Sequence, residues 1–172
     1  MKNNVKVDLL FLCCLFFSFF GSLNGQDDLK WQEIKSLLYN DEKWEYEVRG
    51  ETKDKIRNLI ETTVDSRKLM NRLLEISIKC KTAYTPLSCF ATSHHIRNNP
   101  QLKKEFLDGL FQVVQKHRDK YLTVNPLDTI GLLHNFYTTP PSKEEKEIFM
   151  KLLFDEESHP LVRATCAYFL RN

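Results

Sequence analysis

Histidine and cysteine are the residue types in this chain that could support catalysis or bind a metal ion. After residue 25 the sequence has three cysteines, and two of its histidines, His94 and His95, are adjacent. A thiolate beside an imidazole is an activated nucleophile, and both side chains bind zinc. One interpretation is therefore a secreted hydrolase with a Cys/His site, with or without zinc, built on Cys89, His94, His95 and His134.

The spacing of these residues favours a structural role over a catalytic one. Neighbouring side chains on a helix point about 100° apart, so His94 and His95 are poorly placed to bind one ion together. The sequence has no His-Glu-x-x-His, Cys-x-x-Cys or Gly-x-Ser-x-Gly motif and no Gly-rich phosphate loop. We predict no catalytic, metal-binding or cofactor-binding residues, and we favour a non-enzymatic function in protein binding.

Cys80 and Cys89 suggest a disulfide. They are nine residues apart and could close a small loop around Thr85 and Pro86. Export from the cytoplasm would allow this bond to form. The alternative is that both residues, together with Cys166, are buried thiols, because a free cysteine packs like a small apolar residue.

The first 25 residues have the pattern of a signal peptide. Lys2 and Lys6 precede about 13 apolar residues, a length typical of the apolar segment of a signal peptide and shorter than the roughly 20 residues of a membrane-spanning helix. Small and then acidic residues follow, which places cleavage after Gly25. We predict a signal peptide at 1–25, one domain at 26–172, and a secreted or periplasmic location. An uncleaved signal anchor is the alternative and would be the only membrane association.

Composition narrows the class of the exported domain. The whole chain has five glycines and six prolines, which favours helices over many short strands. Its net charge of +2 falls to about +1 without residues 1–25. A near-neutral domain lacks the basic face that duplex nucleic acid requires, so we predict no nucleic-acid partner.

Apolar periodicity predicts about seven helices joined by short turns. The longest helical tract is 53–82, and Asp65 followed by Ser66 could divide it by capping a second helix. Residues 43–49 alternate as a strand would, but they have no obvious partner strand, so we interpret them as an extended or loosely helical connector. Later helices are predicted to begin at Asn99-Pro100, at Asn125-Pro126, at a capping box from Ser142 to Glu145, and at Ser158 with Pro160 in its first turn.

The last predicted hairpin, residues 152–170, resembles a HEAT repeat. In that family a first helix ends near an Asp, a turn with Pro follows, and Val-Arg opens a second helix whose Ala and Leu face inward. The residues on these positions are Asp155, Pro160, Val162, Arg163, Ala167 and Leu170. The resemblance implies that Ala167 lets the paired helices approach closely, and that Asp155 and Arg163 tie the turn to its neighbour by hydrogen bonds.

A HEAT-like fold would repeat about every 40 residues. Residues 86–117 form another predicted helical pair but lack the Asp and Val-Arg signature. We therefore predict an all-α fold of antiparallel helical hairpins, stacked either as a short α-solenoid-like domain or as an irregular bundle. Such hairpins present an extended surface suited to a protein or peptide partner.

Overall fold

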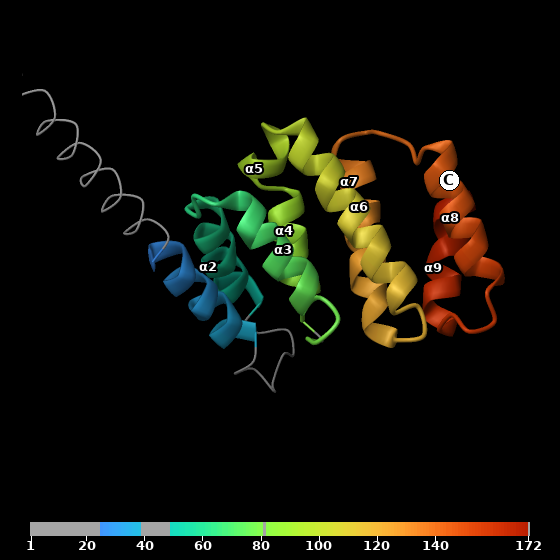
Figure 1. The fold of residues 1–172 in the computed structure, drawn as a ribbon, viewed down its shortest axis with the longest axis horizontal. Helices are drawn as coiled ribbons and strands as arrows, with labels where there is room; N and C mark the ends of the chain where they lie inside the picture. The colour runs from blue at the N-terminus through green and yellow to red at the C-terminus, as the bar shows by residue number, and fades with distance from the viewer. Residues whose placement is uncertain (1–24, 39–48, 81, 172) are drawn as a thin grey trace, which may run out of the picture.

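A computed structural model describes residues 25–38, 49–80 and 82–171, and within these ranges it contains helices and no strand. This confirms the all-α fold class (Figure 1). After the helical residues 25–38, the elements are α2 (Arg49–Glu61), α3 (Ser66–Ile76), α4 (Tyr84–Ala91), α5 (His94–Arg97), α6 (Pro100–Lys116), the 3-10 helix η1 (Tyr121–Thr123), α7 (Val124–Phe136), α8 (Lys143–Phe154) and α9 (Pro160–Arg171).

The long helices form hairpins that follow one another along the longest axis of the molecule (Figure 1). Contacts join α3 with α4, α6 with α7, and α8 with α9. The second helices also pack in a row, since α4 contacts both α2 and α7, and α7 contacts α9. We call α3, α6 and α8 the first-helix layer, and α4, α7 and α9 the second-helix layer.

The spacing of these hairpins is nearly regular. Their second helices begin at Tyr84, Val124 and Pro160, which are 40 and 36 residues apart. The predicted pairing of residues 86–117 is wrong by one helix, because α4 pairs with α3 before it and α6 pairs with α7 after it. The core lies between the two layers and includes the buried rings of Phe90, Phe106 and Phe149.

Three predicted helix starts are confirmed. The Asp65 side chain accepts a hydrogen bond from the backbone N–H of Lys68 at 2.9 Å, so it caps α3. Asn99 accepts one from Leu102 N–H at 3.0 Å, with Pro100 at the first helical position. Ser142 and Glu145 form the predicted capping box of α8.

Two predicted caps are wrong. Helix α7 begins at Val124, so Asn125 lies inside its first turn. Thr123 takes the capping position, but its side chain accepts no hydrogen bond from the backbone N–H groups of the first turn. Ser158 does not cap α9, because its hydroxyl donates to Asp155 at 3.3 Å. The ring of His159 accepts the N–H of Leu161 at 3.2 Å instead. Pro160 lies in the first turn of α9 as predicted, whereas Pro126 is the third residue of α7 and not the first.

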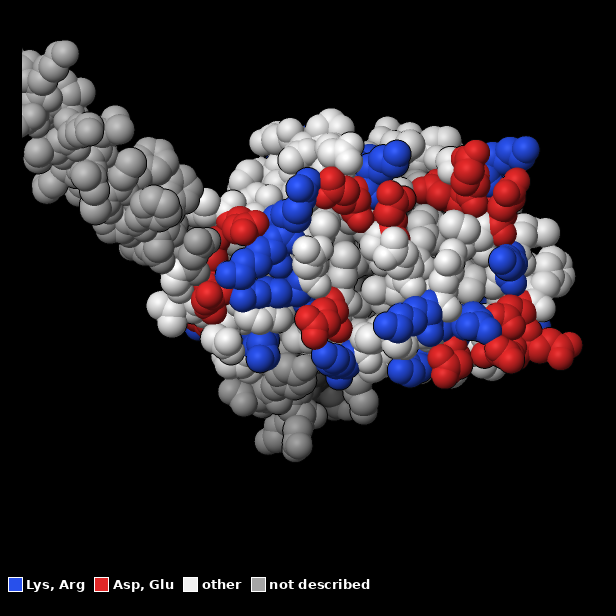
Figure 2. Space-filling view, in the orientation of Figure 1, with Lys and Arg blue, Asp and Glu red and all other residues white. Residues whose placement is uncertain are grey.

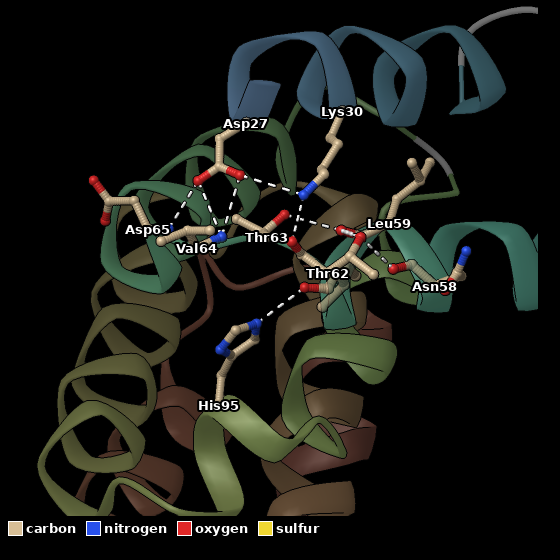
Figure 3. A network of polar contacts seen from close by, with 10 residues as sticks. Asp27, Lys30, Asn58, Leu59, Thr62, Thr63, Val64, Asp65 and His95 are labelled. Atoms are coloured by element: carbon tan, nitrogen blue, oxygen red, sulfur yellow. Dashed lines mark hydrogen bonds and ion pairs between the residues drawn. The ribbon is translucent and has the colours of Figure 1, made fainter. Parts of the chain in front are cut away.

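The first described helix is held against the turn between α2 and α3 by Asp27 (Figure 3). This buried carboxylate accepts the N–H of Val64 at 3.1 Å and that of Asp65 at 2.8 Å. It also lies 3.5 Å from the ammonium of Lys30, which donates to the carbonyl of Thr62. Asp27 thus accepts hydrogen bonds from backbone N–H groups that the turn leaves unpaired. These bonds fix residues 25–38 to the rest of the domain.

Some expectations fall outside the described residues. Residues 1–24 and 39–48 are not described, so the predicted signal peptide and nearly all of the ambiguous segment 43–49 are not tested, and only Arg49 is seen to begin α2. Among the helices that are described, none is both long and apolar enough to cross a lipid bilayer.

Candidate binding groove

Charge is distributed very unequally between the two helix layers. Helices α3, α6 and α8 carry fifteen Lys, Arg, Asp and Glu residues. Helices α4, α7 and α9 carry three, namely Asp128, Arg163 and Arg171. Figure 2 shows the charged side of the molecule, where basic and acidic side chains alternate over the first-helix layer. The second-helix layer therefore lacks the charged coat that a surface facing only water usually has.

A groove runs along this weakly charged layer between α7 and α9. It has a volume of about 530 Å³. One wall is a stripe of α7 at helical spacing, formed by Val124, Asp128, Gly131, Leu132 and Asn135, and the other is a stripe of α9 formed by Leu161, Ala164, Thr165, Tyr168 and Phe169. One end of the groove lies where α4, α7 and α9 begin, and we call it the lower end. Tyr84 from α4 and Tyr121 from η1 complete this end.

Gly131 sets how closely the two walls approach. A Cβ atom at this position would lie 2.6 Å from two ring atoms of Phe169, which is closer than carbon atoms normally come. The missing side chain lets the Phe169 ring lie directly on α7, where it also packs 5.2 Å from the ring of Phe149. The floor of the groove between α7 and α9 therefore depends on glycine.

The groove exposes large apolar and aromatic side chains of a kind that is more often buried in the core. Tyr168 is 62% exposed, Tyr121 is 59% exposed and Leu161 is 46% exposed. Single exposed apolar residues are ordinary, but these line one groove in a surface that is poor in charge. Aromatic side chains at such positions are the usual anchors of protein interfaces.

The groove continues upward as a second hollow of about 370 Å³. This part shares four residues with the first, and its upper end is formed by the loop Thr138–Pro141. His134 supports that loop, because its Nδ1 lies 2.8 Å from the carbonyl oxygen of Thr139 and its Nε2 lies 3.7 Å from Glu145. Thr138 has a positive φ of 51°, which turns the chain between α7 and α8.

The electrostatics of the lower end are set by Asp128. Asp128 is exposed, but the neighbouring groove residues displace some of the water around its carboxylate, which raises its pKa. Tyr84 lines the same end of the groove. Partial burial raises the pKa of its hydroxyl, and the negative charge of Asp128 raises it further. No cation among the described residues pairs with Asp128, whereas Asp27, Asp28 and Asp155 each have one.

The cysteine and histidine residues considered for a hydrolase are distributed over three helices. Cys89 lies in α4, His94 and His95 in α5, and His134 in α7. His94 contacts Glu61, and Nε2 of His95 lies 2.9 Å from the carbonyl oxygen of Ile60. Burial raises the pKa of the Cys89 thiol and lowers that of His95, which favours the neutral form of each. Within the described residues there is no cluster of metal-ligating side chains, so the hydrolase alternative gains no support.

The three cysteines have the thiol form in the structure. Cys80, Cys89 and Cys166 are free and buried. The Cys80 sulfur contacts the hydroxyl of Thr82 at 3.0 Å, in the loop before α4. Burial alone raises the pKa of Cys166 to about 12, as expected of a thiol that packs like an apolar residue.

The residues that carry the resemblance to a HEAT repeat make contacts at the turn between α8 and α9, and one of these contacts reaches the preceding hairpin. Asp155 accepts hydrogen bonds from Arg118, in the loop of the preceding hairpin, and from the N–H of Glu157 at 3.0 Å. Arg163 donates to the carbonyl of Leu153 at 3.1 Å. The expectation that Ala167 allows close helix approach is wrong, because Ala167 is exposed. The other positions behave as core or turn residues: Pro160 opens α9, Val162 is buried and Leu170 packs against the core.

The chain matches no protein-family model, and no curated protein or solved structure is significantly similar to it.

Proposed function

We propose that this chain is an exported, non-enzymatic protein-binding module, and that it binds a short segment of a partner protein in the groove between α7 and α9. The observation that carries the proposal is the second-helix layer, which has three charged residues on three helices and exposes Tyr168 and Leu161 beside Tyr121 of η1. A surface of this composition gains free energy when a partner covers it.

The dimensions of the groove fit a peptide segment. The α7 wall from Val124 to Asn135 is about 17 Å long at a rise of about 1.5 Å per residue. That length accommodates about five residues of an extended chain. The HEAT-like turn at Asp155 and the spacing of the hairpins support a repeat architecture, in which the row of second helices offers a continuous binding surface.

Export is part of the same proposal. It is supported by the apolar pattern of residues 9–21 and by the small residues that follow. The structure adds one constraint, because Asp27 is buried and holds the first helix in place. Cleavage after Gly25 retains Asp27, so the mature domain would keep this contact.

The proposal is tested by selecting binders from a random 12-residue peptide library, using the chain purified from an exporting host. We expect enriched peptides whose affinity falls at least tenfold, about 1.4 kcal/mol, for Tyr168→Ala. Phe154→Ala is the matched control, because Phe154 is an exposed ring of the same hairpin that lies outside the groove. Circular dichroism melts of both variants establish that the fold is retained.

Two outcomes would contradict the proposal. One is a selection that yields no peptide above background. The other is a set of peptides that bind the Tyr168→Ala and Phe154→Ala variants equally well, which would place the binding surface elsewhere.

A further inference from the structure

The lower end of the groove differs chemically from the remainder of it. Tyr84, Tyr121 and Asp128 line this end, and they come from three different elements that all meet where the second helices begin. The remaining lining is apolar or neutral. Asp128 is thus the one acidic side chain of a groove whose other lining residues are apolar or neutral, and it is exposed there.

This carboxylate has no cation to balance it within the described part of the chain. Elsewhere in the molecule, acidic residues at helix contacts are paired: Asp28 lies 2.9 Å from Lys68 and 2.6 Å from Arg72. For Asp128, partial desolvation is the single cause of its raised pKa, and no positive charge offsets it. Asp128 is nevertheless exposed on the groove surface, so a cation brought by a ligand can reach its carboxylate and supply the missing partner.

We propose that this end of the groove is a cation site, in which Asp128, Tyr84 and Tyr121 receive a lysine or arginine side chain of the bound segment. The carboxylate pairs with the charge, and the tyrosine rings cover the aliphatic stem or the planar face of the cation. The inference rests on the proposed function, because it assumes that the groove holds a peptide. It adds the chemistry by which that peptide is chosen.

The direct test uses two small probes that differ only in charge, N-acetyl-arginine amide and its neutral isostere N-acetyl-citrulline amide. NMR spectra of the chain are recorded with the tyrosine rings labelled. We expect saturable shifts of the Tyr84 and Tyr121 signals with the arginine probe, and binding at least about fivefold weaker with the citrulline probe. Equal binding of the two probes, or shifts confined to other parts of the molecule, would overturn the cation site.

A variant pair then separates this inference from the proposed function. Asp128→Asn removes the charge with little change in shape, and Asp108→Asn does the same at an exposed position of α6. Peptides selected on the native chain should carry Lys or Arg and should lose about tenfold in affinity for Asp128→Asn while binding Asp108→Asn normally.

The outcomes of that comparison are distinct. If the selected peptides need Tyr168 but bind Asp128→Asn as tightly as the native chain, the cation site is wrong and the peptide groove remains. If no peptide depends on Tyr168, the groove itself is wrong, and the cation site falls with it.

Discussion

Helix α3 is joined to α6 and to the first helix by ion pairs, whereas α4, α7 and α9 meet through apolar and backbone contacts. Arg67 of α3 pairs with Glu105 of α6 at 2.9 Å. In the second-helix layer, the Phe169 ring lies against Gly131, and the hydroxyl of Tyr137 donates to the carbonyl of Ala91 at 3.4 Å. The same hairpins thus present one face that water solvates well and one that it does not.

This difference is the basis on which we propose the second-helix layer as the binding face. A stack of hairpins buries the inner stripes of both layers equally, so folding alone does not require the outer surfaces to differ. The first-helix layer has the mixed charges of an ordinary solvated surface. The second-helix layer has the exposed tyrosines Tyr84 and Tyr168 instead, and we propose that they contact a partner.

The largest effect is expected when a charge is introduced into the second-helix layer. Thr165→Arg places a long cationic side chain in the α9 wall of the groove, and we expect it to reduce peptide affinity about 100-fold, or about 2.8 kcal/mol. Thermal stability should change little, since Thr165 is only partly buried. The affinity is measured by titration calorimetry with a peptide selected on the native chain.

Gln112→Arg is the control for this experiment, because it adds the same charge at an exposed position of α6. It should leave peptide affinity unchanged. Equal losses from Thr165→Arg and Gln112→Arg would show that net charge matters and that the contrast between the layers does not.

The second-largest effect is expected from a change in packing. It is a loss of stability that can be compared between one glycine in each layer. Gly131→Ala would force the rigid Phe169 ring away from α7, and we expect a loss of about 1–3 kcal/mol in the free energy of unfolding. At Gly109 of α6, a Cβ would meet a terminal methyl group of Leu74 at 2.5 Å. This methyl group can rotate aside, and alanine is favoured over glycine in a helix by about 1 kcal/mol, so Gly109→Ala should cost less. Urea denaturation of both variants gives the comparison, and a larger loss at Gly109 would contradict it.

The sequence predicted the fold class because its signals are local. The apolar periodicity, Asp65, Asn99-Pro100 and the Ser142–Glu145 capping box each act within a few residues of the chain. The misplaced caps show the limit of such signals: Asn125 and Ser158 are good capping residue types, but the hydroxyl of Ser158 is engaged by Asp155, a contact made only once the turn has folded.

The groove was not predicted, because its two walls come from helices separated by α8. Tyr121, Asp128 and Tyr168 are ordinary residues when read along the chain. One signal was present, the near absence of Lys, Arg, Asp and Glu from the stretches 84–91, 124–136 and 160–171. It acquires meaning only when α4, α7 and α9 are known to lie side by side.

The smallest effect is expected from an ion pair of the charged face. Asp28→Asn removes the partner of Lys68 and Arg72, and we expect a slight decrease in melting temperature that disappears in 1 M NaCl, because salt screens exposed pairs.

The hydrogen bonds from Lys68 and Arg72 hold the pKa of Asp28 below its usual value of 3.8. The stabilisation is therefore present above that value and is lost as the pH falls below it. Melting curves at neutral pH and near pH 3 should show the native chain approaching the variant in acid. A difference that persists in high salt would mean that Asp28 acts through packing, and the electrostatic contrast between the layers would then lose its clearest example.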